Sequence, residues 1–218
     1  MTRFIADLQF WRRFTVASPQ CSFKFLLGLM PFNPNELFSD ACTSYGMAGI
    51  LRFGPSRRRE HDVDGLFWQY SWVEWTKIVC MLRLMPGAVQ INVAEFLAAL
   101  ITCETFAPYC RATCTLLSVD SKAAKYWIDN ARCSIYPFDR CAQGTHLLLL
   151  KESIKIRSRW IASDSNAPAD VCSRRRITMK CPRHFIAGLW LRKVRPKYTN
   201  VLKYLPKNSA TKHAIMQK

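Results

Sequence analysis

Four acidic residues stand where the sequence pattern predicts strand ends or helix starts, namely Asp40, Glu95, Asp120 and Asp170. Singly, each has an ordinary explanation, because an acid can bond to the backbone of a turn, cap a helix or stabilise its first turn. Held together, four carboxylates repel one another strongly unless a cation neutralises them. Histidine is absent from all four positions, which favours Mg2+ with oxygen ligands over zinc. If the fold brings the four acids together, the sequence therefore predicts a site for hard divalent ions.

The elements that would position these acids are predicted from apolar periodicity and turn residues. In chain order they are strands at 36–42, 47–53 and 66–72, a helix at 91–106, a strand at 114–120, helices from 121 and from 138, a strand at 155–161 and a helix from 166. The first three strands form a meander that includes a polar loop at 54–65, and the later strand–helix–strand crossovers make part of the sheet parallel. Ligands of such sheets bind beyond the carboxyl ends of the strands, where the next helices begin. The four acids are therefore expected to converge.

The residues around these acids form short motifs in a fixed order. They are Phe38-Ser39-Asp40-Ala41 with Gly46, Asn92-Val93-Ala94-Glu95 followed by Ala98, Val119-Asp120-Ser121 with Trp127, and Asn166-Ala167-Pro168-Ala169-Asp170 followed by Ser173-Arg174. In this order the motifs resemble those of the ribonuclease H domain, over residues 36 to 176. The most similar version of that domain is carried by retrotransposon reverse transcriptases of the gypsy and DIRS type, here without the polymerase palm.

The resemblance implies a ribonuclease H-like α/β fold, in which helices flank a mixed five-stranded sheet made of a three-strand meander and two strands joined by helix crossovers. It also implies an enzyme, a two-metal phosphodiesterase that hydrolyses the RNA strand of RNA–DNA hybrids as an endonuclease. Two Mg2+ ions, for which Mn2+ can substitute, would be bound by the catalytic residues Asp40, Glu95, Asp120 and Asp170. Contacts with the nucleic acid are expected from Ser44, Tyr45, Arg174, Arg175 and Arg176.

Two other functions stay open for the same fold. One is a catalytically inactive, nucleic-acid-binding remnant of a reverse transcriptase, because fold alone does not give activity. The other is a transposase or resolvase that cuts DNA. The expected partner is nucleic acid, above all an RNA–DNA hybrid, and a reverse transcriptase polymerase domain is a further candidate partner.

The positive charge of the chain is concentrated near its C-terminus. The formal net charge is +17, no acidic residue follows Asp170, and thirteen of the 32 Lys and Arg residues lie between Arg174 and Lys218. Such a segment binds polyanions by releasing their counterions, and nucleic acid is the commonest such partner. The alternative is a solvated tail that only aids solubility.

The length of 218 residues, half of them apolar, suits one domain with appendages. We expect an amphipathic lead-in helix and linker at 1–35, the ribonuclease H-like domain at 36–176 and a basic, partly disordered tail at 177–218. The ten cysteines form no Cys-x-x-Cys pair, which favours reduced core residues over a zinc site. No apolar run approaches the length of a membrane span, and the N-terminus lacks the layout of a signal peptide. The expected location is therefore inside the cell, in the cytoplasm or nucleus, without membrane association.

Overall fold

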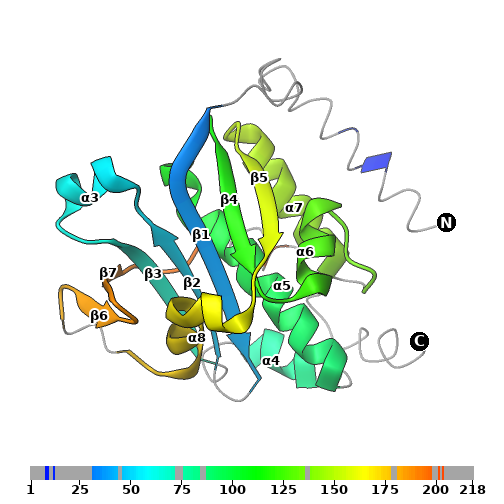
Figure 1. Cartoon of the computed structure of the whole chain (residues 1–218). Helices are drawn as coiled ribbons and strands as arrows, with labels where there is room; N and C mark the ends of the chain where they lie inside the picture. The colour runs from blue at the N-terminus through cyan, green and yellow to red at the C-terminus, as the bar shows by residue number, and fades with distance from the viewer. Residues whose placement is uncertain are drawn as a thin grey trace.

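Seven strands form one mixed sheet in the part of the chain that the computed structural model describes, with helices on both of its faces (Figure 1). The described residues are 8–9, 12, 31–43, 46–71, 76–83, 87–135, 138–177, 181–197, 201 and 203. The strands are β1 (Phe32–Cys42), β2 (Gly46–Arg52), β3 (Gly65–Ser71), β4 (Cys114–Val119), β5 (Lys155–Trp160), β6 (His184–Ile186) and β7 (Leu189–Lys193). The helices are α3 (Pro55–His61), α4 (Thr76–Arg83), α5 (Gly87–Phe106), α6 (Lys122–Asp129), α7 (Phe138–Lys151) and α8 (Ala167–Arg174), with short 3-10 helices η2 (Ala107–Tyr109) and η3 (Ser163–Asn166).

The strands follow the order β5-β4-β1-β2-β3-β7-β6 across the sheet. The first three form an antiparallel meander, and β4 and β5 extend it in parallel on the side of β1. Helices α4 and α5 lie between the meander and β4 in the chain, and α6 and α7 lie between β4 and β5. This arrangement confirms the predicted fold class, a ribonuclease H-like mixed sheet flanked by helices. The sheet has seven strands instead of the predicted five, because β7 and β6 are added beyond β3.

Helix α5 packs against β1, β2, α6 and α7 and is buried on nearly all sides, as its apolar pattern predicts. Gly49 lets it approach the sheet closely, since a Cβ there would lie 2.0 Å from the hydroxyl oxygen of Thr102. By length and composition the segment Val89–Tyr109 is apolar enough to cross a membrane, but 78% of its most apolar window lies buried within the fold. A core helix passes the same test, so the place of α5 in the core explains its apolar character.

The opposite face of the sheet is covered by α8. Successive residues of β2 point to alternate faces: Leu51 packs in the larger core with α5, whereas Ala48 and Ile50 pack with Ala169 and Cys172 of α8. The neighbouring strand β1 contacts both α5 and α8. Side chains from two helices on opposite faces can therefore reach the same end of β1.

The C-terminal segment differs from the expectation of a tail that begins at residue 177. Residues 184–193 contain the hairpin of β6 and β7, in which β7 pairs in parallel with β3, and Ile186 and Leu191 are buried on the α8 side of the sheet. These strands are short and lie in a basic stretch between Pro182 and Pro196, so neither periodicity nor composition indicates them. Partial disorder of the rest of the tail stays a prediction.

Two elements near the meander were also missing from the expected set. The predicted polar loop at 54–65 contains α3, which starts at Pro55, a residue suited to the first turn of a helix. Helix α4 precedes α5 in the larger core, where Ile78 is buried. Of the predicted lead-in helix, residues 8, 9 and 12 are described and helical, and the rest lies outside the described residues.

Candidate metal centre and active site

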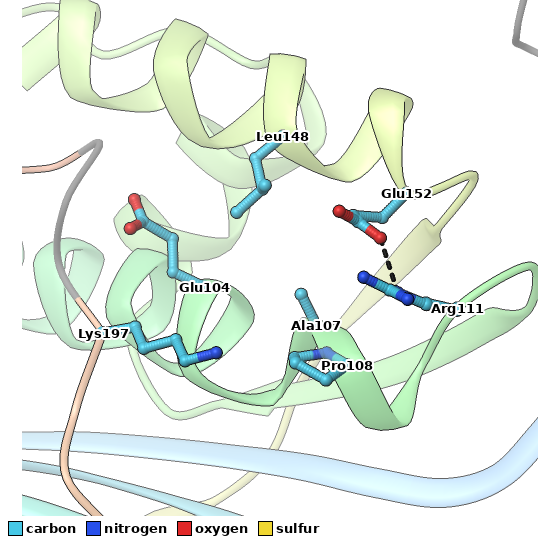
Figure 2. A pocket seen from close by; sticks show the side chains of 7 residues that line it. All are labelled: Glu104, Ala107, Pro108, Arg111, Leu148, Glu152 and Lys197. Atoms are coloured by element: carbon cyan, nitrogen blue, oxygen red, sulfur yellow. Dashed lines mark ion pairs between the residues drawn. The ribbon is translucent and has the colours of Figure 1, made fainter.

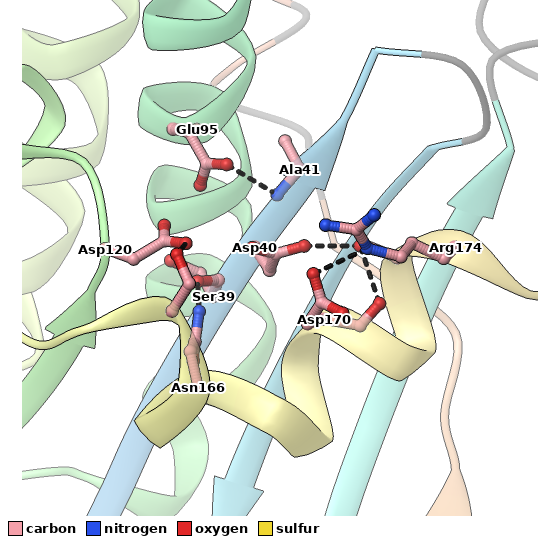
Figure 3. A network of polar contacts seen from close by, with 10 residues as sticks. Ser39, Asp40, Ala41, Glu95, Asp120, Asn166, Asp170 and Arg174 are labelled. Atoms are coloured by element: carbon pink, nitrogen blue, oxygen red, sulfur yellow. Dashed lines mark hydrogen bonds and ion pairs between the residues drawn. The ribbon is translucent and has the colours of Figure 1, made fainter.

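Three of the four predicted acids meet at one end of the sheet. Asp40 lies in β1, Glu95 in α5 and Asp120 directly after β4. Each offers a carboxylate oxygen, and these oxygens lie within 4.8 Å of one another. Figure 3 shows the side chains of Glu95 and Asp120 on one side of Asp40, with Asp170 and Arg174 on the other. We call Asp40, Glu95 and Asp120 the carboxylate cluster.

The sheet register explains why Asp40 and Asp120 are neighbours. Strands β1 and β4 are parallel and adjacent, and Phe38 pairs with Ser118, so both acids stand two residues further along at the carboxyl ends of their strands. Asp40 pairs with Ala48 across β1 and β2, which turns its side chain to the face that α8 covers. Parallel pairing thus produces the convergence expected from the sequence.

Glu95 reaches the cluster from the middle of α5, not from a helix cap. The helix was predicted to start at residue 91 but already begins at Gly87, so Glu95 lies beyond its first turn. Glu95 Oε1 instead accepts a hydrogen bond of 3.0 Å from the backbone N–H of Ala41 in β1. Asn92 Oδ1 accepts a hydrogen bond from the hydroxyl of Ser121. Helix capping therefore does not explain the acid at position 95.

Asp120 is likewise free of a capping role in its helix. Ser121 is the N-cap of α6, and its hydroxyl accepts a hydrogen bond from the backbone N–H of Ala124. The carboxylate of Asp120 accepts a 3.0 Å hydrogen bond from the hydroxyl of Ser163, at the start of η3. The side chain is therefore oriented toward the loop that leads into α8.

Asp170 lies in the first turn of α8 and outside the 4.8 Å group. Its carboxylate is held by Arg174 one turn later, at 2.6 Å from Nε. Its charge nevertheless raises the pKa of both Asp40 and Glu95, so it borders the carboxylate cluster. The fourth predicted acid is therefore beside the site but bound to a cation of the protein.

Two side chains of the α8 segment belong to the motifs found in the sequence but were not predicted as site residues. Ser173 donates a hydrogen bond from its hydroxyl to Asp40 Oδ2, and Asn166 donates one of 2.9 Å from its amide to the carbonyl oxygen of Ser39. Asn166 precedes α8 as predicted, but its side chain makes no capping bond. The spacing of three residues between Asp170 and Ser173 puts both on one face of a helix, and this signal could have identified Ser173.

The predicted nucleic-acid contacts are only partly described. Arg174 is exposed and paired with Asp170, and Arg175 and Arg176 are exposed just after α8. Ser44 and Tyr45 lie outside the described residues. The three arginines therefore stand on the surface at the end of the helix that borders the carboxylate cluster.

Burial sets the protonation of the cluster. Asp40 is 3% exposed, and burial, with smaller contributions from Asp120 and Asp170, raises its pKa to about 7 despite the hydrogen bond from Ser173. Burial and the charge of Asp40 also raise the pKa of Glu95 well above its ordinary value. Without a cation, the cluster therefore tends to hold protons near neutral pH.

The donor set fits a hard divalent cation. Among the described residues, Glu95 Oε2 is buried without a hydrogen-bond partner, although it lies beside the other two carboxylates. An unsatisfied buried oxygen of this kind is costly unless a ligand completes it. All ligand atoms of the cluster are carboxylate oxygens, which suits Mg2+ or Mn2+.

A cleft of about 240 Å3 lies elsewhere, between the end of α5, α7 and the C-terminal segment (Figure 2). None of the four acids lines it, and its residues are Glu104, Ala107, Pro108, Arg111, Leu148, Glu152 and Lys197. Arg111 and Glu152 form an ion pair of 2.6 Å at its wall. Glu104 accepts hydrogen bonds from Thr145 and from the backbone N–H of Val201, which attaches the C-terminal segment to the core.

Comparison with known proteins finds only distant structural similarity. No protein-family model and no curated protein sequence matches the chain. Similar solved structures include RNase H1 from the halophilic archaeon Halobacterium salinarum, at 16% identity and a TM-score of 0.40, covering 63% of this chain and 92% of that one. Another is the N-terminal RNase H domain of a Mycobacterium tuberculosis protein, at 15% identity and a TM-score of 0.40, covering 63% of this chain and 87% of that one. Similarity at this level carries no argument about activity, and it is the strand order and pairing that give the described part of the chain a ribonuclease H-like fold.

Proposed function

We propose that this chain is a metal-dependent endoribonuclease that hydrolyses the RNA strand of RNA–DNA hybrids. The observation that carries the proposal is the carboxylate cluster, in which oxygens of Asp40, Glu95 and Asp120 lie within 4.8 Å of one another. Its place at the carboxyl ends of two parallel strands is where sheets of this kind bind ligands. Three buried or half-buried acids so close together are costly to the fold unless protons or a cation neutralise them.

The cluster is built to hold cations in a fixed position. One oxygen of each carboxylate is oriented by a donor of the protein, from the hydroxyl of Ser173, the N–H of Ala41 and the hydroxyl of Ser163. These donors come from α8, β1 and η3, so the geometry depends on the packing of the domain rather than on a mobile loop. Preorganised ligands of this kind reduce the cost of ordering the site when a ligand binds.

The carboxylate cluster, with Asp170 as a fourth ligand, would hold two Mg2+ ions or Mn2+ in their place. When bound, these ions supply a nucleophilic water and stabilise the leaving oxygen of a phosphodiester. Burial favours protons on Asp40 and Glu95, and these two residues would have to release them when metal binds. The hydrogen bonds from the protein would keep the carboxylates in position. Arg174 neutralises Asp170 in the metal-free protein and would have to release it for four-ligand binding.

The charge of the chain supports a nucleic-acid substrate. Arg175 and Arg176 are exposed beside the helix that borders the cluster, and the chain as a whole carries a formal charge of +17. Phosphate contacts of this type give affinity without sequence specificity. The preference for a hybrid follows from the motif resemblance, and the 2′-hydroxyl contacts assigned to Ser44 and Tyr45 stay a prediction.

A second candidate is a nucleic-acid-binding protein without activity. It is favoured by the ion pair of Asp170 and Arg174, which takes the fourth acid out of the cluster. Descent from a retrotransposon reverse transcriptase, with a polymerase domain as partner, is proposed from the sequence motifs alone.

The test is cleavage of matched substrates by the full chain. RNA–DNA hybrid, double-stranded RNA and double-stranded DNA of one sequence are incubated with Mg2+, with Mn2+ or with a chelator. We expect cleavage of the RNA strand of the hybrid, and no product in the chelator. Cleavage of DNA would identify a DNA-cutting enzyme, and tight binding of hybrid without any product would identify the binding protein.

A further inference from the structure

The hairpin of β6 and β7 carries an aromatic surface that the carboxylate cluster does not use. Phe185 and Trp190 are cross-strand partners, with ring centroids 5.1 Å apart, and they are 62% and 45% exposed. Large side chains of this kind are normally the first to be buried, so two neighbouring exposed rings indicate a binding surface.

The turn and the neighbouring loop hold this surface rigidly. Ala187 and Gly188 both have positive φ, the arrangement that joins two strands in a two-residue hairpin. The backbone of Trp190 is fixed by two 2.7 Å hydrogen bonds, in which its N–H donates to the Asp64 carboxylate and its carbonyl accepts from the Asp64 N–H. The inner residues Ile186 and Leu191 are anchored in the core. The backbone of the hairpin is therefore held in place, and the side chains on its outer face stay exposed.

Arginine flanks the two rings on the same outer face. The guanidinium carbon of Arg183 lies 5.2 Å from the ring centroid of Trp190, and its Nη1 pairs with Asp62 at 2.8 Å. Arg192 is exposed two residues after Trp190, and no carboxylate of a described residue pairs with it. Asp62 offsets part of this charge, but the outer side chains of the hairpin themselves comprise aromatic rings and arginines only. We call Arg183, Phe185, Trp190 and Arg192 the hairpin platform.

We propose that the hairpin platform binds single-stranded nucleic acid, with unpaired bases stacked on Phe185 and Trp190 and phosphates contacted by the two arginines. Aromatic rings stack on any base whose face is exposed, whereas the bases of a duplex are already stacked on each other. The charged side chains of the hairpin platform are all positive, and the chain carries a formal charge of +17, which matches a polyanion better than an ordinary protein surface. The chemistry therefore favours an unpaired strand over a duplex or a protein.

The position of the platform separates it from the carboxylate cluster. Strands β2, β3 and β7 lie between β1, which carries Asp40, and the edge strand β6. With four strand spacings, this corresponds to roughly 19 Å across the sheet. Asp40 points to the face that α8 covers, as do Ile186 and Leu191, so the outer rings of the platform lie on the opposite face of the sheet. Binding of a single strand there does not depend on hydrolysis at the cluster.

Binding of two probes by the full chain in chelator tests the proposal. The probes are a short oligothymidylate and an abasic strand of the same length, which carry the same phosphates but differ in bases. The parent protein should prefer the oligothymidylate by about tenfold or more, as stacking of one or two bases provides. Phe185→Leu should remove most of this preference, because it keeps an apolar side chain but loses the ring, and Phe185→Tyr should retain it.

The matched control is Phe32→Leu, because Phe32 is 56% exposed but lies in β1, away from the hairpin. It should bind both probes as the parent does, and all variants should bind blunt hybrid equally. Equal affinity of the parent for the two probes, or a preference that survives in Phe185→Leu, would overturn the proposal. Loss of blunt-hybrid binding in Phe185→Leu would overturn it as well. Because no step requires cleavage, this failure is distinct from failure of the proposed nuclease activity.

Discussion

The hydroxyl of Ser173 in α8 donates a hydrogen bond to Oδ2 of Asp40 in β1, across 133 residues of sequence. The same hydroxyl lies 2.9 Å from the carbonyl oxygen of Asp170. Ser173 thereby links the helix that carries the fourth acid to the central carboxylate of the cluster. Its hydrogen bond stabilises the ionised carboxylate and so lowers the pKa of Asp40, whereas burial raises that pKa.

Ser173→Ala should weaken metal binding most at neutral pH. Without the hydroxyl, the pKa of Asp40 rises further, so a proton competes with the cation more strongly. The variant should also unfold more easily, by about 1–3 kcal/mol for loss of a hydrogen bond to a charged group. Mg2+ titrations at several pH values check this, and the affinity deficit should shrink as the pH is raised. A deficit that is constant with pH would mean that Ser173 does not tune Asp40.

The metal-free protein should lose stability as the pH rises. The pKa of Asp40 is 3.8 in its ordinary state and about 7 in the fold, so between these values the folded protein holds a proton that the unfolded chain releases. The free energy of unfolding therefore falls with pH across this window. Asp40→Asn removes the contribution of Asp40 and leaves the one that burial of Glu95 makes, so its stability should fall less steeply and exceed that of the parent by roughly 2 to 4 kcal/mol above pH 7. Thermal melting in chelator from acid to alkaline pH measures the difference, and parallel curves for the two proteins would contradict the assignment.

Divalent metal should raise the melting temperature. A ligand that binds the folded state alone stabilises it by about 2.7 kcal/mol at one hundred times its dissociation constant. Mg2+ also relieves repulsion within the carboxylate cluster, so the shift should be larger at pH 8 than at pH 5, where protons already neutralise Asp40. Asp164→Asn, at an exposed acid of η3, is the matched control and should respond as the parent does. A midpoint that is insensitive to Mg2+ at every pH would show that the three acids do not form a metal site.

The basic tail should contribute affinity without selectivity, but the truncation has to spare the hairpin of β6 and β7. Removal of residues 204–218 deletes Lys207, Lys212 and Lys218 and leaves the buried residue Val201 in place. The slope of log affinity against log salt should flatten by about 0.9 for each lysine that contacts a duplex phosphate. Hybrid and DNA duplex should lose affinity equally. An unchanged slope would mean that these lysines do not touch the nucleic acid.

The sequence predicts the meander and the two parallel strands because each carries a local pattern long enough to recognise. Strand β4 with Asp120 at its end is an example, since a short apolar run leads directly to an acid and a cap residue. The β6–β7 hairpin has no such pattern, because its strands are short and its outer positions hold rings and arginines in place of the usual polar residues. Its stability comes from pairing with β3 and from burial of Leu191, which are tertiary effects.

Local signals also misled where tertiary contacts took precedence. Asn92 is a strong capping residue, yet α5 begins at Gly87, and Val89 and Ile91 before and beside Asn92 pack against the core. The partner of Glu95 could not be predicted, because its bond to Ala41 depends on the distance between α5 and β1, which composition and spacing do not specify. The ion pair of Asp170 with Arg174 lies within one helix, and their spacing of four residues could have predicted it.

Cleavage of the RNA strand of a labelled hybrid by parent, Asp40→Asn and Asp164→Asn proteins, in Mg2+ and at equal bound fraction, tests the central claim most directly. Asp40 lies at the centre of the carboxylate cluster, whereas Asp164 is exposed in η3. The account predicts that the parent and Asp164→Asn cut the RNA strand. Asp40→Asn should bind the hybrid at least as tightly, but its cleavage rate should fall by roughly a thousandfold or more, because the ligands act as a unit. Folded parent protein that binds the hybrid and leaves its RNA strand intact in both Mg2+ and Mn2+ would contradict it.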